Sequence, residues 1–476
     1  MGNSSSLFVP ACMAFFILVS NHTCAETLED ALSDAYETNP QLLSERAHLR
    51  AVDEGVPQAL ANWRPEIEFS GSAGAERATN SPYQPSETFL LAPPGCATPC
   101  IGIPTRMPST TPAVSNTTPN TIDITVTQPL YRGGRTVAQT AVAEKTVQAE
   151  RAKLVATEGA VLFAVVQAYL DVVRDQAILG LSRANEQLLQ KQLESTEKQY
   201  RIGSLTRTDV SQAKAQYENA SAGRNQAEGN LQVSRAAYER VVGHLPPWLS
   251  LPTLRPVLPA TFDEALALAT KNPTVISALF SEDAAREQVK VIRGQLLPTI
   301  SIVGEYQRLN DVAFLRSDTV NASVIARMTM PLYEGGSVYS QTRQAVQVVG
   351  QLQGVTDDTR RLAIQNATQA WQQIVAARAQ QESLHEAEIA AEAAFLGIQA
   401  EQRVGTRTIL DVLITEQQLY STRTQLVTVQ HDLVLAQFNL AQQIGKLTAS
   451  DLRLGITLYN VDSHYRKVRD KWLGFD

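Results

Sequence analysis

Charged side chains beside two glycine-containing turns are the residues of this chain with the clearest chemical potential. Asp209 follows a turn at Gly203-Ser204. Arg407 and Asp411 follow a similar turn at Gly405-Thr406. An arginine can hold a carboxylate through two parallel hydrogen bonds, and this contact is strong where water is excluded and weak where it is wet. Aspartates in the first turn of a helix are also favoured by the helix dipole. The pattern therefore indicates either a polar latch between helix ends or ordinary helix caps with a surface arginine.

The chain lacks the side-chain patterns that catalysis needs. It has no nucleophile elbow, no glycine-rich phosphate loop and no His and carboxylate cluster at ligand spacing, and its six His are scattered. Cys96 and Cys100 lie in a Pro-rich insert that the second half of the chain lacks, and an oxidising compartment would allow them a small disulfide. A metal site there would need further Cys or His ligands nearby, and there are none. We predict that the protein is not an enzyme and has no cofactor or metal site.

Two copies of one arrangement place the turns at the ends of long helices. The first copy begins with Pro-Leu-Tyr-Arg-Gly-Gly at 129–134 and the second with Pro-Leu-Tyr-Glu-Gly-Gly at 331–336, and every matched position differs by 202. In both copies the turn glycine follows the last glycine of the motif by 69 residues, and nearly all of that span is typical of continuous helix. Such a helix is about 100 Å long. Helices returning from the turns complete hairpins over 135–242 and 337–444.

The returning helices are too short to cover their long partners. Each has about 37 residues and ends at a glycine, Gly243 or Gly445. In the first copy, the 24 residues from Pro40 to Trp63 have nearly the missing length. We therefore expect the shorter helices to stack end to end beside each long helix.

Four segments show the alternation of polar and apolar residues that marks β-strands. They lie near 66–75 and 121–128 in the first copy and near 299–309 and 322–330 in the second. Each is about as long as the 9 to 11 residues with which a tilted strand crosses hydrocarbon. Open sheet edges are not tolerated in lipid, and four strands cannot close a barrel. The chain should therefore oligomerise so that several copies share one barrel.

These features divide the chain into five parts. Residues 1–25 are similar to a secretory signal peptide, because they carry no charged side chain, contain an apolar run and end in Thr-Cys-Ala. A membrane anchor is the alternative, although the run is shorter than a spanning helix needs. We find no later stretch that is apolar enough for such a helix. The other parts are repeat 1 at 26–245, a Pro-rich linker at 246–260, repeat 2 at 261–447 and a polar C-terminal tail at 448–476.

Composition argues against one class of partner. With 44% hydrophobic residues, 19% charged residues and a net charge of -7, the chain lacks the basic character of nucleic-acid-binding proteins. A membrane barrel remains compatible with these values, because alternating strands leave no hydropathy peak.

Taken together, the sequence resembles the TolC family of outer-membrane export ducts. The resemblance covers nearly the whole chain after residue 25 and rests on the two repeats, the two Pro-Leu-Tyr-x-Gly-Gly motifs and the stretch from Gly405 to Leu413. It implies an α+β membrane protein with an internal twofold repeat, in which a homotrimer shares a transmembrane β-barrel and a long α-helical barrel, or tunnel, across the periplasm. It also implies that the protein lies in the outer membrane of a Gram-negative cell, in contact with lipid. Its implied protein partners are a periplasmic adaptor protein and an inner-membrane pump of the RND or ABC type.

The resemblance also assigns roles to the turns. Family members close the periplasmic end through contacts between an acidic residue of the first return helix and an arginine of the second turn, and a ring of aspartates narrows the pore. Thr208 and Asp209 match the first partner, Arg407 the second and Asp411 the ring. Gln402 stands where the family has a tyrosine latch, and Ile414 replaces a further aspartate, so we expect a weaker latch and a less acidic ring. Four turn residues would form exposed tips that meet the adaptor: Gly203, Ser204, Gly405 and Thr406.

The cargo stays open at this point. Efflux of drugs or toxic compounds and dedicated type I protein secretion cannot be separated, because the pump and adaptor select what enters the duct. A non-conducting coiled-coil scaffold of the cell envelope would also use long helices, but the alternating strands argue against it.

Overall fold

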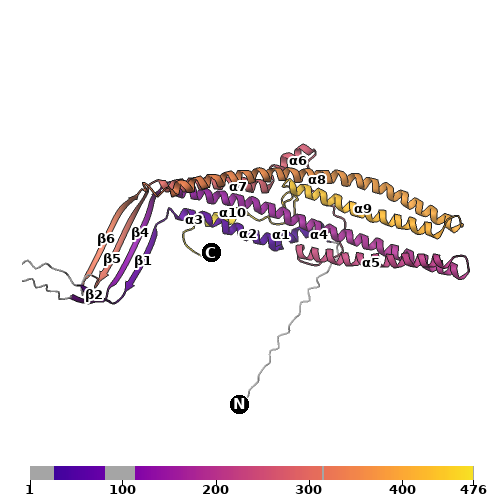
Figure 1. The fold of residues 1–476 in the computed structure, drawn as a ribbon, viewed down its shortest axis with the longest axis horizontal. Coiled ribbons are helices and arrows are strands. Elements are labelled where there is room, and N and C mark those ends of the chain that lie inside the picture. The colour runs from indigo at the N-terminus through magenta and orange to yellow at the C-terminus, as the bar shows by residue number, and fades with distance from the viewer. Residues whose placement is uncertain (1–25, 81–112, 313–315, 475–476) are drawn as a thin grey trace, which may run out of the picture. The chain divides into compact units, whose positions relative to one another are not determined.

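The computed structural model describes residues 26–80, 113–312 and 316–474 (Figure 1). The signal peptide expected at 1–25 and the Cys96–Cys100 pair lie outside these ranges. The described chain is mostly helical with a smaller sheet component. In chain order its elements are α1 (Leu28–Thr38), α2 (Pro40–Asp53), α3 (Gly55–Ala61), β1 (Glu66–Ala73), β2 (Glu76–Asn80), β3 (Ala113–Thr117), β4 (Asn120–Arg132), α4 (Arg135–Arg201), α5 (Arg207–Val242), α6 (Phe262–Ala269), α7 (Pro273–Arg293), the 3₁₀ turn η1 (Gly294–Leu296), β5 (Thr299–Asn310), β6 (Asp318–Thr329), α8 (Ser337–Arg403), α9 (Ile409–Gln443) and α10 (Val461–Val468).

The chain forms two compact units, each assembled from both halves of the sequence. The first unit holds residues up to Ala47, Ala152–Val275 and Thr359–Tyr459. The second unit holds His48–Arg151, Ile276–Asp358 and the residues from Asn460 onward. The compact units therefore cut across the two sequence repeats, and each unit is described by itself below.

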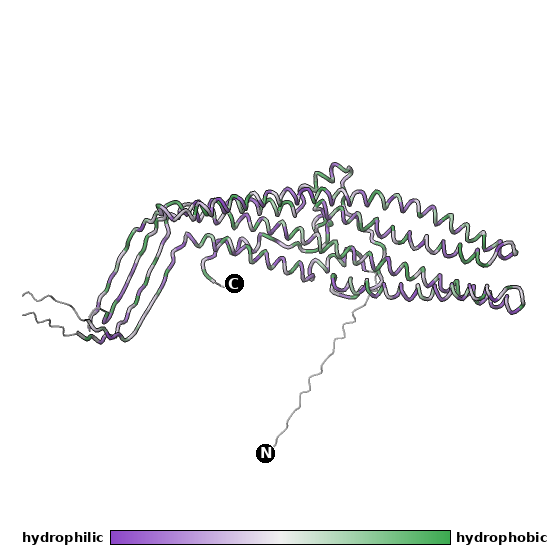
Figure 2. The backbone as a smooth tube through the Cα atoms, viewed as in Figure 1, coloured by the Kyte–Doolittle hydropathy of each residue, from purple (hydrophilic) through white to green (hydrophobic). Residues whose placement is uncertain are grey.

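A four-stranded antiparallel sheet belongs to the second unit. Its strand order is β1–β4–β5–β6, so β4 of the first repeat pairs with β5 of the second. A separate two-stranded sheet pairs β2 with β3. Hydrophilic and hydrophobic residues are interspersed along the strands (Figure 2), as the alternating sequence pattern predicts.

The strand boundaries differ from the predicted ones, and the prediction did not include β2 and β3. Two differences span four residues. β4 continues to Arg132, whereas we expected the strand to end after Gln128, and β6 begins at Asp318 rather than near 322. The register against β5 shifts between Pro129 and Tyr131, which marks a bulge. A bulge tolerates proline because one residue there is left out of the ladder, and proline has no N–H to donate. In the second repeat β6 ends at Thr329, before the corresponding Pro331.

The two long helices have identical lengths. α4 and α8 each contain 67 residues, and their first and last residues differ by 202. Contrary to the expectation from sequence, one stretch of α4 is long and apolar enough to cross a membrane. Half of that stretch is buried inside the protein, which is typical of a core helix. The stretch is therefore weak evidence for a membrane span.

Small residues allow close helix packing in the first unit. One cluster joins Ala265 of α6, Ala370 of α8 and Leu440 of α9, all fully buried. Alanines at such contacts let helix axes approach closely. Larger side chains fill the space elsewhere in this unit, where Tyr169, Tyr238 and Phe438 are fully buried.

Two asparagines join shorter helices end to end in the first unit. The Asn39 amide group donates to the Val241 carbonyl oxygen at 2.9 Å, near the end of α5, while its own carbonyl oxygen accepts from the Gln41 backbone N–H at 3.0 Å. Asn272 makes the equivalent contacts with Gln443 of α9 at 2.6 Å and with the Thr274 backbone N–H at 2.9 Å. Each asparagine satisfies the last carbonyl groups of one helix and the first amide groups of the next. The expected end-to-end stacking is thus present at both joints.

Two shorter segments differ from the sequence-based expectation. The stretch from Pro40 to Trp63 is divided into α2 and α3 rather than one helix. The C-terminal tail contains α10, which packs within the second unit. There the His464 Nδ1 lies 3.2 Å from an oxygen of the buried Asp53, and Arg151 pairs with Asp462 at 2.8 Å. The described part of the tail from Asn460 onward therefore belongs to the second unit, whereas the tail residues up to Tyr459 belong to the first.

Candidate functional site

The two turns between long and returning helices have the same backbone geometry. In the first, the Gly203 N–H donates to the Tyr200 carbonyl at 2.9 Å, and the Ser204 N–H donates to the Gln199 carbonyl at 3.0 Å. The equivalent bonds of the second turn run from Gly405 to Gln402 and from Thr406 to Glu401, at 3.0 and 3.1 Å. Both glycines have positive φ, at 79° and 83°. This pair of bonds is a Schellman motif, which ends a helix through a left-handed residue.

Capping boxes begin both returning helices. At α5, the Thr206 hydroxyl accepts from the Asp209 N–H at 3.3 Å, and the Asp209 carboxylate accepts from the Thr206 N–H at 2.8 Å. Thr408 and Asp411 make the same bonds at α9, at 3.3 and 3.0 Å. The hydrogen bonds from Thr206 and Thr408 lower the pKa of Asp209 and Asp411, so both carboxylates stay charged. Within a single chain, both aspartates act as helix caps.

Arg407 pairs with a residue that sequence reasoning did not select. Its Nε lies 2.9 Å from a Glu401 carboxylate oxygen, and both side chains are about half exposed. No ion pair joins Arg407 to Asp209 in the part of the chain that the structure describes. Glu401 stands six residues before Arg407, on the other side of the turn, so only the turn geometry brings them together.

The other predicted turn residues are placed as follows. Thr208 is exposed in the first turn of α5, and Gln402 is partly exposed in the last turn of α8. The four tip residues are all exposed. Both turns are therefore exposed, and each returning helix begins at a capping box next to its turn.

A buried carboxyl group lies behind the second turn and was also missed. Glu416 is 5% exposed, and within the described ranges its Oε1 has no hydrogen-bond partner. Burial raises its pKa to about 7. Its neighbours along α9, Val412, Leu413 and Leu419, are buried too, so Glu416 occupies the apolar stripe of the helix. A sequence signal existed, because Glu416 falls three to four residues from these apolar positions.

The four-stranded sheet has one apolar face and one polar face. Residues directly opposite in register share a face, and one such row is Phe69, Ile124, Tyr306 and Ala322. The row beside it, one residue along each strand, is Glu68, Thr125, Glu305 and Ser323. Side chains on the apolar face remain open to solvent, with Ile67 70% and Val324 80% exposed. An isolated soluble protein would cover such a face.

The outer strands of this sheet have unpaired edges. Within the described ranges, β1 pairs only with β4 and β6 pairs only with β5. An unpaired edge presents a row of free backbone N–H and C=O groups. The sheet is therefore incomplete in a single chain.

The structure also brings together three side chains that could hold a cation. Glu26, Asp34 and His244 place their ligand atoms within 4.8 Å of one another. Glu26 and His244 stand 218 residues apart in the sequence, so local spacing gave no signal for this cluster.

Comparison with known proteins agrees with this geometry. Residues 31–244 and 265–446 match the family model described as outer membrane efflux protein. Outer membrane efflux protein BepC of Brucella suis is 32% identical over 460 residues, which cover 96% of this chain and 94% of that protein. Outer membrane protein TolC of Vibrio cholerae is 27% identical over 464 residues, covering 94% and 96%. Alkaline protease secretion protein AprF of Pseudomonas aeruginosa is 26% identical over 337 residues, covering 68% and 67%.

A solved structure shows the same fold. The CmeC outer membrane channel of Campylobacter jejuni matches with a TM-score of 0.73 and 14% identity, covering 94% of this chain and 89% of that chain. Each matched family region covers most of one repeat, and the relatives include efflux and secretion proteins. The chain therefore belongs to the outer membrane efflux protein family, as a TolC-type channel protein of the outer membrane.

Proposed function

We propose that three copies of this chain form one exit duct across the periplasm and the outer membrane. The duct would be the last component of a tripartite system, in which an inner-membrane pump and a periplasmic adaptor deliver drugs, other toxic compounds or secreted proteins. The observation that carries the proposal is the incomplete sheet, with an apolar face, a polar face and two free edges.

Closing the sheet between copies satisfies its free edges. In hydrocarbon no water can bond an open edge, so a spanning sheet must become a closed barrel. Three copies with four strands each would give a twelve-stranded barrel, within the range of outer-membrane barrels. The apolar face would then contact lipid, and the polar face, with Glu68 and Glu305, would line the channel.

Exposed apolar residues of α8 support packing between copies. Leu362, Ile389 and Leu396 are each at least half exposed, at 50%, 52% and 57%. By contrast, α4 buries Val165, Val166 and Leu170 within its own chain. Exposed apolar side chains on a long helix are expected to pack against a partner. In the proposed trimer, α8 meets a neighbouring copy and the twelve helices form the tunnel.

The gate would lie at the two turns. Threefold symmetry would bring three Asp411 carboxylates around one axis, where they repel one another and attract cations. Arg407 would exchange its partner Glu401 for Asp209 or Thr208 of a neighbouring copy when the duct closes. Gln402 would add an amide contact, and the tip residues Gly203, Ser204, Gly405 and Thr406 would meet the adaptor. Opening would then be a shift of packed helices between two arrangements.

Single-channel conductance in a planar bilayer tests this proposal. We expect small, cation-preferring currents from the wild type and clearly larger currents from Asp209→Ala combined with Arg407→Ser. Arg403→Ser is the control, because Arg403 is an exposed arginine of the same helix end whose contact is Gln399 at 3.2 Å. Equal currents from all three proteins would support the duct but contradict the assignment of Asp209 and Arg407 to its gate. Absence of conductance in every protein would favour the envelope scaffold.

Gene deletion separates the two cargo classes. Loss of tolerance to drugs and bile salts supports a general efflux duct, which is the function we favour. Unchanged tolerance together with loss of one secreted protein would establish the dedicated type I secretion channel instead.

A further inference from the structure

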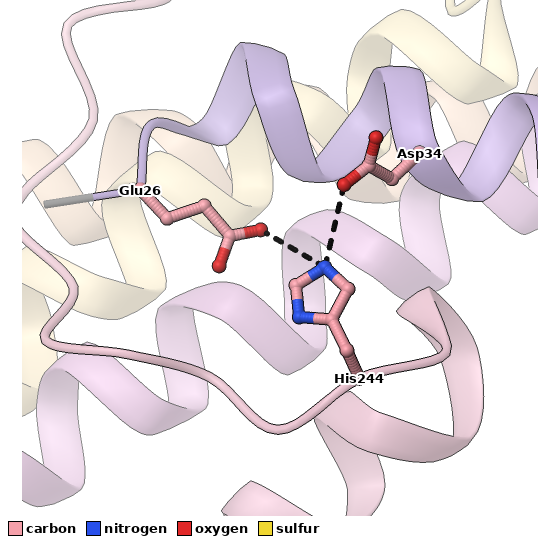
Figure 3. Close-up of side chains that lie close together, drawn as sticks. All are labelled: Glu26, Asp34 and His244. Carbon is pink, nitrogen blue, oxygen red and sulfur yellow. Dashed lines mark hydrogen bonds and ion pairs between the residues drawn. The ribbon is translucent and has the colours of Figure 1, made fainter. Parts of the chain in front are cut away.

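Three polar side chains from distant parts of the first unit converge beside the start of α1 (Figure 3). Glu26 precedes α1, Asp34 lies within it, and His244 follows Gly243 at the end of α5. The His244 Nε2 lies 3.5 Å from the Glu26 Oε1 and 3.3 Å from the Asp34 Oδ2. This group, the Glu26–Asp34–His244 cluster, has no part in the channel described above.

Hydrogen bonding fixes which nitrogen of His244 is available. The Nδ1 lies 3.2 Å from the Leu245 carbonyl oxygen, and a carbonyl oxygen can only accept. Nδ1 must therefore carry a hydrogen in this bond. The Nε2 then faces two carboxylate oxygens, which are also acceptors. A lone pair on Nε2 would be repelled by both oxygens. Either a proton on Nε2 or a bound cation must therefore lie between these three atoms.

Glu26 is built into the protein rather than extended into solvent. Its side chain is only 10% exposed, and its Oε1 accepts a hydrogen bond of 2.7 Å from the Tyr238 hydroxyl. Its Oε2 is buried and has no hydrogen-bond partner among the residues that the structure describes. Nearby, the Tyr169 hydroxyl lies 3.0 Å from the Glu26 carbonyl oxygen. An unpartnered carboxylate oxygen at such a depth is costly unless a cation or a proton compensates it.

The distances suit a small divalent ion with nitrogen and oxygen ligands. Zinc takes His nitrogen and carboxylate oxygen at about 2.0–2.2 Å, usually in a tetrahedron, which sets ligand atoms roughly 3.4 Å apart. The two separations from Nε2 are 3.5 and 3.3 Å, and all three ligand atoms lie within 4.8 Å of one another. Metal-binding His residues commonly donate their second N–H to a backbone carbonyl, as His244 does to Leu245. The Tyr238 hydroxyl would orient the Glu26 carboxylate in the same way.

We propose that the Glu26–Asp34–His244 cluster binds one divalent transition-metal ion of the zinc class, which ties the start of α1 to the end of α5. His244 supplies Nε2, while Glu26 and Asp34 each supply a carboxylate oxygen, and water would complete the coordination. This proposal does not depend on the trimer or its gate.

Protons are the direct competitors of the ion. The other ionisable groups that act on the cluster are Asp30, on α1, and Tyr238 and Tyr169, which contact Glu26. Glu29 also acts on Tyr169. Apart from His244 these groups are acidic, so the local field favours a cation on Nε2, be it a proton or a metal. Metal affinity should therefore fall about tenfold per pH unit below the pKa of His244.

The test uses the full, processed protein without a histidine tag, stripped with a chelator and dialysed against dilute zinc chloride. We expect one zinc ion per chain by elemental analysis. Cobalt substitution should give the visible absorption bands of a four-coordinate ion with nitrogen and oxygen ligands. Zinc should also raise the unfolding temperature of the stripped wild type.

Matched variants decide the outcome. His244→Gln and Asp34→Asn should lose the ion and the thermal shift, and the second is expected to fold, because the Asp34 side chain is 56% exposed. His48→Gln is the control, since His48 also faces a carboxylate, Glu150 at 3.5 Å, but only one. Zinc retained equally by wild type and Asp34→Asn would overturn the proposal. Absence of bound zinc in the wild type at pH 8 would also overturn the proposal. The proton on Nε2 would then be the explanation for the approach of His244 to two carboxylates.

Discussion

The Asn272 side chain donates a hydrogen bond of 2.6 Å to the carbonyl oxygen of Gln443, the last residue of α9. The same side chain accepts from the backbone N–H of Thr274 at the start of α7. One buried amide therefore serves two helix ends, which would otherwise leave polar backbone groups without partners. Asn39 does the same between α5 and α2.

Replacing either asparagine should destabilise the first unit. Asn272→Ala or Asn39→Ala removes one donor and one acceptor at a buried joint, which should cost about 1–2 kcal/mol. Urea unfolding followed by circular dichroism measures this change. Asn230→Ala on the exposed face of α5 serves as the control and should be nearly neutral. If all three variants unfold at the same urea concentration, the joints contribute nothing to stability.

Gly133 should tolerate substitution much less well than its counterpart Gly335. Both have positive φ, at 63° and 62°, so alanine strains the backbone of either by about 1–2 kcal/mol. A Cβ on Gly133 would in addition clash with the Gly294 carbonyl oxygen, whereas no atom of the described chain lies within 4 Å of one on Gly335. Overpacking typically adds about 1–3 kcal/mol.

Comparing Gly133→Ala with Gly335→Ala by thermal unfolding thus isolates the contact. Gly294→Ala should resemble Gly133→Ala, because its Cβ would lie 2.6 Å from the Gly133 carbonyl oxygen. Equal losses for Gly133→Ala and Gly335→Ala would show that backbone strain alone makes these glycines necessary.

Glu416 should make stability depend on pH. Burial raises its pKa from the usual 4.5 to about 7 in the folded protein. Between these values the folded state holds a proton that the unfolded state has released. The contribution of protonated Glu416 to the free energy of unfolding is therefore complete below about pH 4.5. It is lost as the pH rises to about 7, because the buried carboxyl group then becomes charged.

Glu416→Gln should remove this loss, because a neutral amide has no charge to bury. At pH 8 we expect the variant to be more stable than the wild type by up to about 3 kcal/mol. Unfolding measured at pH 5 and pH 8 tests this expectation, with the exposed Glu382→Gln as the control. The expectation is contradicted if the stability difference between the wild type and Glu416→Gln is the same at pH 5 and pH 8. It is also contradicted if Glu416→Gln is less stable than the wild type at pH 8.

Asp411→Asn should separate the charge of the proposed pore ring from helix capping. An asparagine oxygen can still accept from the Thr408 N–H, so the helix start should persist. Loss of three negative charges near one axis should reduce the preference for cations in reversal-potential measurements under a salt gradient. Asp209→Asn makes the same change at the other capping box and should leave selectivity nearly unchanged. A cation preference that survives Asp411→Asn would place the selective charges elsewhere, with the strand residues Glu68 and Glu305 as the next positions to test.

Local patterns in the sequence determined the helices, the turns and the alternating strands. The spacing of 202 residues recurs in α4 and α8 and in both turns, because helix formation and Schellman turns depend on neighbouring residues. For Asp209 and Asp411 the sequence left a latch and helix capping open, and a single chain shows the capping boxes. The sequence pattern did not predict β2 and β3. It also ended the strand before Pro129, because the bulge that admits this proline depends on pairing with β5.

Only the tertiary structure decided which distant segments meet. It pairs β4 with β5 across the repeats, and it sets one asparagine between two helix ends at each joint. It also gives Arg407 its partner Glu401 and brings Glu26 within 3.5 Å of His244. Periodicity shows that a residue belongs to the apolar stripe of a helix, but the burial of Glu416 depends on what covers that stripe. Contacts of this kind arise from non-local packing, so no local spacing records them.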